Sequence, residues 1–185
     1  MARVITFSRT FPSYHPKAGQ PTLFVEKFLR SLGTYYMDCV MEHSGFSFHS
    51  LNRGKEKYVE EFISSEFNLL EDYLPKHHTI RAGHRFKVGD KFSPRVWSGN
   101  PYNSKQIIIA PDTEIVKVWD FVIKLDEADE PSIYLNGKFY SQIGAGDSVE
   151  IAKNDGLTVM DMKLWFKHPK PFDGQIIAWS DIPNY

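Results

Sequence analysis

Apolar residues follow two different spacings along the chain. In the first part they recur every three to five residues, which is typical of helices with one buried face. This spacing predicts a helix that starts at Pro21 and ends at Gly33, and a second helix over Lys55–Leu74 that Pro75 terminates. A short apolar strand over Arg3–Phe7 precedes both helices.

The pattern becomes mostly extended after His78. Short apolar stretches alternate there with Gly, Asp and Asn, which is typical of strands joined by turns. Strands or hairpins are predicted at Phe92–Trp97, Gln106–Ala110, Ile115–Leu125, Ser132–Tyr140 with a turn at Asn136-Gly137, and Gly174–Trp179.

Two short helices are predicted among these strands. One covers Ser148–Lys153, and the other covers Leu157–Phe166 with Met160, Leu164 and Trp165 facing inward. Strands that pair across long sequence separations, together with a few helices, indicate an α+β fold around a curled sheet or a small barrel.

Composition narrows the class of protein. The chain of 185 residues is 42% hydrophobic and 24% charged, which suits a single domain over residues 1–185. Cys39 is the one cysteine in the sequence, and its apolar neighbours favour a buried thiol over a nucleophile. No apolar run reaches the ~18 residues of a membrane span, and the N-terminus reads as a strand and not as a signal peptide. We therefore expect a cytoplasmic protein with no membrane partner.

Positive charge is concentrated between Lys76 and Lys105. This segment holds seven Lys or Arg residues and one acidic residue, so its net charge is +6 in a chain whose total is −1. Charge of this kind attracts phosphates, and interleaved aromatic rings can stack on bases. The alternative is a solvated basic hairpin with ordinary core aromatics. The interleaved aromatic residues are Phe86, Phe92, Trp97 and Tyr102.

The same segment contains His77, His78 and His84. Adjacent histidines on a strand point to opposite sides, and no cysteine or regular ligand spacing accompanies these three. The sequence also has no glycine-rich phosphate-binding motif and no nucleophile-elbow motif. We therefore expect neither a metal nor a cofactor.

Several short motifs together resemble one known family, the ASCH domain of the PUA-like superfamily. The resemblance implies a small mixed β-barrel with flanking helices, in which residues 13–74 form a mainly helical insertion after the first strand. The motifs are Ile5-Thr6-Phe7, Lys76-x-x-Thr79-Ile80-Arg81, Lys87-x-Gly89-Asp90 and Ile151-Ala152-x-x-Asp155-Gly156-Leu157, followed by Asp161, Trp165-Phe166 and a closing strand after Gly174.

The resemblance also implies a site. Enzymatic members of the family resemble a small bacterial acetylcytidine amidohydrolase, which uses a lysine, a threonine three residues later and a glutamate near a later helix. Lys76 and Thr79 match the first two positions, and Asp155, one methylene shorter, falls at the third. Thr79 would be the nucleophile, Lys76 the base and Asp155 the orienting group.

This catalytic set has a geometric requirement. In a regular strand Lys76 and Thr79 face opposite sides, so the chemistry needs an irregular backbone around His77-His78. The alternative is that Lys76 is solvated and Thr79 is an ordinary strand residue.

Five further residues are candidates for ligand binding. The Arg81 guanidinium can grip a phosphate or carboxylate in two places or stack on a base, although an ion pair with Asp90 or Asp155 is an alternative role. Trp97 and Tyr102 belong to a loop that combines stacking surface with small polar groups, although Trp97 also fits a core position. The full set is Arg81, Arg85, Lys87, Trp97 and Tyr102.

Two functions follow from these residues as hypotheses. The first is an ASCH-like module that binds RNA or a modified nucleoside through a basic, aromatic-lined cleft. The alternative is an amidohydrolase that deacylates an acylated cytidine-type nucleoside. A ribonuclease and a protein-binding adaptor are weaker possibilities, and the oligomeric state is left open by the sequence.

Overall fold

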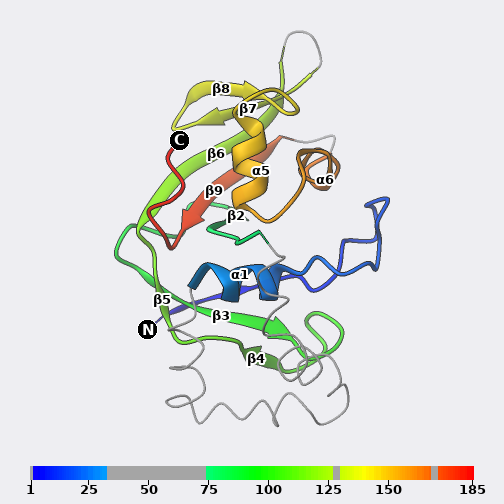
Figure 1. The fold of residues 1–185 in the computed structure, drawn as a ribbon, viewed down its shortest axis with the longest axis vertical. Helices are drawn as coiled ribbons and strands as arrows, with labels where there is room; N and C mark the ends of the chain where they lie inside the picture. The colour runs from blue at the N-terminus through cyan, green and yellow to red at the C-terminus, as the bar shows by residue number, and fades with distance from the viewer. Residues whose placement is uncertain (1, 33–73, 127–129, 168–170) are drawn as a thin grey trace. The chain divides into compact units, whose positions relative to one another are not determined.

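The computed structural model describes residues 2–32, 74–126, 130–167 and 171–185 (Figure 1). The helix predicted over Lys55–Leu74 lies, apart from its last residue, outside the described residues, and so does Cys39. Contacts divide the described residues into two compact units, and each is treated by itself. The first unit falls within Met1–Arg9, Leu23–Pro75 and Lys91–Thr113, and the second within Thr10–Thr22, Lys76–Asp90 and Glu114–Tyr185.

In its described residues, the first unit contains a small sheet and one helix. Its strand β3 is central, because β1 pairs with it in parallel and β4 pairs with it in antiparallel orientation, while the two-residue β5 also pairs with β3. The bounds are β1 Arg3–Thr6, α1 Phe24–Leu32, β3 Lys91–Trp97, β4 Gln106–Ile108 and β5 Thr113–Glu114.

Helix α1 lies alongside strand β3 in Figure 1 and buries an aromatic ring. The ring of Phe28 is fully buried, and its centroid lies 4.9 Å from that of Phe7 and 6.3 Å from that of Phe92. The helix and the first strand predicted from the apolar spacing are therefore confirmed in kind, with small differences at their ends.

The second unit is a five-stranded sheet with the order β2-β9-β6-β7-β8, with helix α5 in front of it and α6 beside α5 in the view of Figure 1. All four neighbouring pairs are antiparallel. The bounds are β2 His78–Ala82, β6 Lys117–Leu125, β7 Pro131–Leu135, β8 Lys138–Gln142, α5 Ser148–Asn154, α6 Val159–Trp165 and β9 Phe172–Ala178.

Local turn chemistry fixes the β7–β8 hairpin. Asn136 and Gly137 both adopt positive φ angles, 49° and 79°, as a two-residue turn between right-handed twisted strands requires. The hairpin predicted at this dipeptide is confirmed.

The predicted inward face of α6 is wrong. Met160 is 60% exposed and Leu164 and Trp165 are half-buried, whereas Asp161 and Met162 are buried. The reason is the helix start: the Thr158 side chain caps the backbone N–H of Asp161, which sets the rotation of the first turn.

The α+β class predicted from the sequence is confirmed. Among the described residues the strands form two sheets, and no closed barrel is present. The PUA-like barrel and the single domain with an insertion at residues 13–74 stay predictions.

Strand β9 lies between β2 and β6 in the second unit, and Gly174 allows β2 to approach it. Gly174 pairs with Ala82 of β2 on one side and with Phe121 of β6 on the other. A Cβ atom at Gly174 would lie 2.1 Å from the carbonyl oxygen of Arg81, well inside van der Waals contact. The backbone of β2 can therefore pack here only against a residue without a side chain.

We expect Gly174→Ala to lower the free energy of unfolding by about 2 kcal/mol, because the added methyl must push β2 away from β9. Chemical denaturation followed by circular dichroism measures this change. Gly146→Ala is the matched control: its Cβ would meet nothing within 4 Å. The control should change the free energy by less than about 0.5 kcal/mol. Equal effects of the two substitutions would show that the close approach of β2 to Gly174 does not restrict the side chain at this position.

Candidate functional site

A buried ion pair joins the sheet of the second unit to helix α5. Lys76 directly precedes β2 and is 1% exposed; Asp155 is the C-cap of α5 and is also buried. The Lys76 ammonium donates to the Asp155 carboxylate and to the Asp155 backbone carbonyl. The two residues that the sequence proposed as base and orienting group, Lys76 and Asp155, therefore lie in contact. The alternative of a solvated Lys76 is wrong.

Backbone hydrogen bonds hold the same junction. The His77 N–H donates to the Asn154 carbonyl over 2.8 Å, and the Trp179 N–H donates to the His77 carbonyl over 3.3 Å. These bonds place Lys76 ahead of the first ladder pair of β2, His78 with Ala178. Lys76 is therefore not bound by the alternation of the strand, which relaxes the geometric objection to a Lys76–Thr79 site.

Thr79 lies inside this region, on β2. Its side chain is 4% exposed, and its backbone pairs with Ile177 of β9 in unbroken register. Thr79 is thus a buried strand residue that follows the ion-paired lysine by three positions.

Burial and charge act against each other at the pair. Burial raises the pKa of Asp155, and the positive charges of Lys76 and Arg81 only partly offset this effect. Burial likewise lowers the pKa of Arg81, while the Asp155 carboxylate raises it. Arg81 thus interacts electrostatically with Asp155, one of the two carboxylates that its sequence position suggested.

A second layer of polar groups surrounds the pair. His78 is fully buried, and its Nε2 lies 4.0 Å from Asp155 Oδ1. Its Nδ1 lies 3.0 Å from the Tyr185 hydroxyl, which accepts a hydrogen bond from Asn154 Nδ2 over 2.9 Å. Burial, followed by the charges of Lys76 and His77, lowers the pKa of His78 well below its usual value, so the imidazole is neutral.

The predicted ligand-binding residues divide between the two units. Arg81, Arg85 and Lys87 belong to the second unit, where Arg85 and Lys87 are exposed. Trp97 and Tyr102 belong to the first unit, at the β3–β4 connection.

The β3–β4 connection presents an aromatic pair. Tyr102 is 87% exposed with a positive φ of 65°, and its ring lies 5.3 Å from that of Trp97. Trp97 is half-buried and so is not a core residue.

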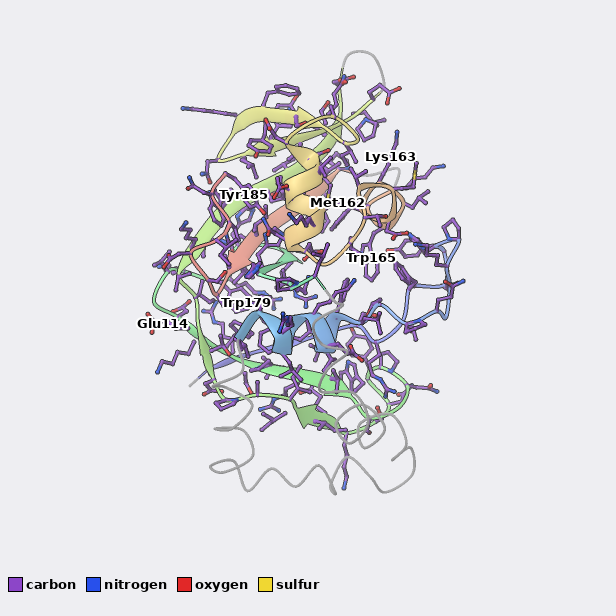
Figure 2. The ribbon with its side chains drawn as sticks, in the orientation of Figure 1. Glu114, Met162, Lys163, Trp165, Trp179 and Tyr185 are labelled. Atoms are coloured by element: carbon purple, nitrogen blue, oxygen red, sulfur yellow. The ribbon has the colours of Figure 1, made fainter. Side chains whose placement is uncertain are left out.

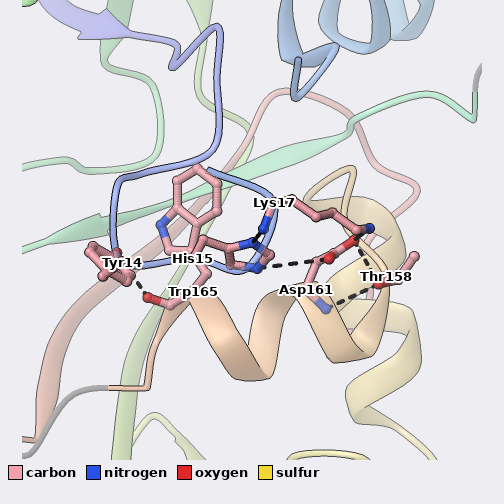
Figure 3. A network of polar contacts seen from close by, with 6 residues as sticks. All are labelled: Tyr14, His15, Lys17, Thr158, Asp161 and Trp165. Atoms are coloured by element: carbon pink, nitrogen blue, oxygen red, sulfur yellow. Dashed lines mark hydrogen bonds and ion pairs between the residues drawn. The ribbon is translucent and has the colours of Figure 1, made fainter. Parts of the chain in front are cut away.

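A second polar network, missed from the sequence, ties the loop before α1 to helix α6 (Figure 3). Lys17 Nζ donates to Asp161 Oδ2 over 2.8 Å, and Thr158 Oγ1 donates to the same oxygen over 2.8 Å. His15 Nε2 lies 3.8 Å from Asp161 Oδ1, and the Tyr14 hydroxyl donates to the Trp165 carbonyl. Burial by itself raises the pKa of Asp161. The hydrogen bonds from Lys17 and Thr158 outweigh burial and leave this pKa below its usual value.

A third cluster is exposed to solvent and involves two inner strands of the sheet, β6 and β9. His84 Nδ1 is 2.8 Å from Asp120 Oδ1 of β6, and His84 Nε2 is 2.8 Å from Asp173 Oδ1 of β9. Both ring nitrogens must donate to serve two carboxylates, so this link requires the protonated imidazolium. The link fastens the chain after β2 to β9 and to β6.

Sequence signals existed for only part of these networks. Thr158-x-x-Asp161 has the spacing of a helix-capping pair, which could have identified the start of α6. Nothing in the sequence pairs His78 with Tyr185 or Lys17 with Asp161, because each pair is joined by tertiary contact across more than 100 residues.

The described residues carry two further findings. No group of three or more His, Cys, Asp or Glu side chains among them is arranged to hold a metal ion. In the same part of the chain, every helix is too short or too polar to cross a membrane.

Comparison with family models, with curated proteins and with solved structures finds no match to this chain.

We expect Lys76→Met to lower the free energy of unfolding by about 3–5 kcal/mol, because it leaves the Asp155 carboxylate buried without its ammonium. Urea denaturation measures the loss. The exposed pair between Lys153 and Glu150, 3.8 Å apart, supplies the control. Lys153→Met should cost less than about 1 kcal/mol. A cost for Lys76→Met as small as the control's would contradict a buried pair.

We expect the His84 link to stabilise the fold at low pH only. The hydrogen bonds to Asp173 and Asp120 raise the pKa of His84. Its stabilisation is therefore fully present below the unfolded pKa of about 6.5 and is lost as pH rises through the folded pKa. The difference in free energy of unfolding between wild type and His84→Gln should be largest near about pH 6 and shrink toward about pH 9, in low salt. A difference that does not change with pH would exclude the charged link.

Proposed function

We propose that the second unit binds a nucleoside-type ligand at the cluster formed by Lys76, Asp155 and Arg81. The observation that carries this proposal is the buried Lys76–Asp155 pair, flanked by a second cation. A buried ion pair contributes little to stability compared with apolar residues of similar volume, and clusters of ionisable groups with displaced pKa values mark functional sites. The resemblance to the ASCH domain supports the same region.

The donor and acceptor types of the cluster suit a cytosine edge. That edge presents an exocyclic amine, which donates, beside a ring nitrogen and a carbonyl, which accept. A carboxylate such as Asp155 accepts from the amine, and the cations of Lys76 and Arg81 donate to the other two groups. Uracil offers a carbonyl in place of the amine and would face Asp155 with like polarity.

Aromatic rings and exposed cations in the same unit would let the site accept nucleotides or short single strands as well as nucleosides. The rings of Trp119 and Tyr140 lie 5.1 Å and 6.2 Å from the ring of Tyr185, so aromatic surface stands next to the His78 side of the cluster. Arg85 and Lys87 are exposed in the same unit and would interact with the phosphates of a nucleotide or a short single strand.

The amidohydrolase is the second candidate, and the meeting of Lys76 with Asp155 favours it. In that reaction Thr79 Oγ bonds to the acyl carbon, the carbon–nitrogen bond breaks, and the amine leaves with a proton; water then hydrolyses the ester on Thr79. Lys76 would have to lose a proton before it could take one from Thr79, yet Asp155 stabilises its ammonium form. Because removing the proton from Lys76 is costly, we rank binding above hydrolysis as the proposed function.

We expect cytidine and N4-acetylcytidine to raise the melting temperature and to bind in calorimetry, with uridine weaker. Arg81→Ala should weaken cytidine binding about tenfold, since it removes a charged donor. Arg85→Ala is the matched control and should change nucleoside affinity less than about twofold, because its side chain is exposed.

The same titrations separate the alternatives. If an oligonucleotide binds instead, with an affinity that falls steeply with salt and with Arg85→Ala, the ligand is RNA. Deacetylated product from wild type and none from Thr79→Ala would establish the amidohydrolase. The absence of both nucleoside and oligonucleotide binding would overturn the proposal.

A further inference from the structure

Tyr185 belongs to the segment that follows β9 (Figure 2), and its hydroxyl lies 3.0 Å from His78 Nδ1 beside the candidate site. Polar contacts along this segment hold it in place. Lys117 Nζ donates to the carbonyls of Asp181 and Pro183, over 2.9 Å and 2.8 Å. Trp119 Nε1 donates to the Tyr185 carbonyl over 3.3 Å. Strand β6 therefore positions the ring that ends beside His78.

One hydrogen bond at the Tyr185 hydroxyl has a direction that chemistry fixes, the bond from Asn154. Asn154 Nδ2 can only donate, so the hydroxyl accepts from it and has its own proton left to give. Two acceptors are within reach: His78 Nδ1 at 3.0 Å and the Glu150 carbonyl at 3.4 Å. The contact with His78 Nδ1 is the shorter of the two, and a hydroxyl that donates there makes Nδ1 the acceptor.

This direction selects one tautomer of His78. A neutral imidazole that accepts at Nδ1 carries its proton at Nε2, and Nε2 lies 4.0 Å from Asp155 Oδ1. The opposite tautomer would place the Nε2 lone pair against the carboxylate in a fully buried position, which is unfavourable. The polar chain therefore runs from Asn154 through Tyr185 and His78 toward Asp155.

We propose that Tyr185 is a positioning residue of the Lys76–Asp155 site: its hydroxyl holds His78 in the tautomer whose Nε2–H faces the Asp155 carboxylate. The role rests on the proposed function, since it matters only if Asp155 receives a ligand. With the Nε2–H of His78 facing the carboxylate from 4.0 Å and Lys76 hydrogen-bonded to it, the carboxylate keeps a constant orientation toward the ligand's amine.

The test combines a spectroscopic readout with binding. Nitrogen-15 NMR of the imidazole reports the tautomer of His78 in the free protein, whether or not any ligand binds. Wild type should show the Nε2–H form. Tyr185→Phe, which keeps the ring, should show a mixture with the Nδ1–H form and should bind cytidine about fivefold more weakly. Tyr134→Phe, a hydroxyl removed from a ring that packs on Phe139 of β8, is the control and should change neither readout.

A double-mutant cycle separates positioning from a structural effect. His78→Gln supplies an amide donor that has no tautomer, so in that background Tyr185→Phe should cost no further affinity. An Nε2–H signal that persists in Tyr185→Phe overturns the inference even if cytidine binds. A changed tautomer with unchanged cytidine affinity also overturns it. If wild type binds no nucleoside, the proposed function fails and the positioning role fails with it; the NMR result then shows separately whether Tyr185 sets the tautomer.

Discussion

The second unit depends on one buried ion pair, between Lys76 and Asp155. Each charge would cost several kcal/mol if it were buried alone, so the pair is tolerated only where the start of β2 meets the end of α5. The backbone bonds from His77 to Asn154 and from Trp179 to His77 close the same junction. Helix α5 is therefore attached to the sheet in one register, and a sliding of either element would separate the two charges.

The same constraint decides which chemistry the cluster favours. An ammonium held by a carboxylate is a hydrogen-bond donor and not a base, so this buried cluster offers two cationic donors and one acceptor, which is why we propose binding first. Hydrolysis would require the proton of Lys76 to move. Burial raises the pKa of Asp155, which makes this carboxylate a better proton acceptor than an exposed one. The cost of moving the proton from Lys76 to Asp155, which catalysis requires and binding does not, therefore depends on how deeply Asp155 is buried.

Sequence reasoning succeeded where the signal was local. The Asn136-Gly137 turn, the helix over Phe24–Leu32 and the strand over Phe172–Ala178 follow from residue types within a few positions of one another. It failed at α6, because the rotation of a two-turn helix depends on its capping contact and on Asp161 packing against a distant loop. Apolar spacing alone assigned the wrong face.

The candidate site was predictable only in part for the same reason. The resemblance to the ASCH domain selected Lys76, Thr79 and Asp155 from the sequence, but the roles of His78 and Tyr185 come from a contact between residues 107 positions apart. Arg81 illustrates the limit: its sequence position allowed two carboxylate partners, and only the fold identifies Asp155 as one that interacts with it.

Two Lys–Asp–His groupings occur in the second unit, and their electrostatics distinguish them. At Asp161 the lysine side chain is 45% exposed, a hydroxyl adds a second hydrogen bond, and the pKa of the carboxyl falls. At Asp155 the lysine is buried, and the pKa of the carboxyl rises. A carboxylate that is well stabilised by its own partners has little to gain from a ligand, so Asp161 serves as a latch between loop and helix. At Asp155 the effect of burial outweighs Lys76, Arg81 and the backbone hydrogen bond from Ile80, and for this reason our proposal places the ligand's amine at Asp155.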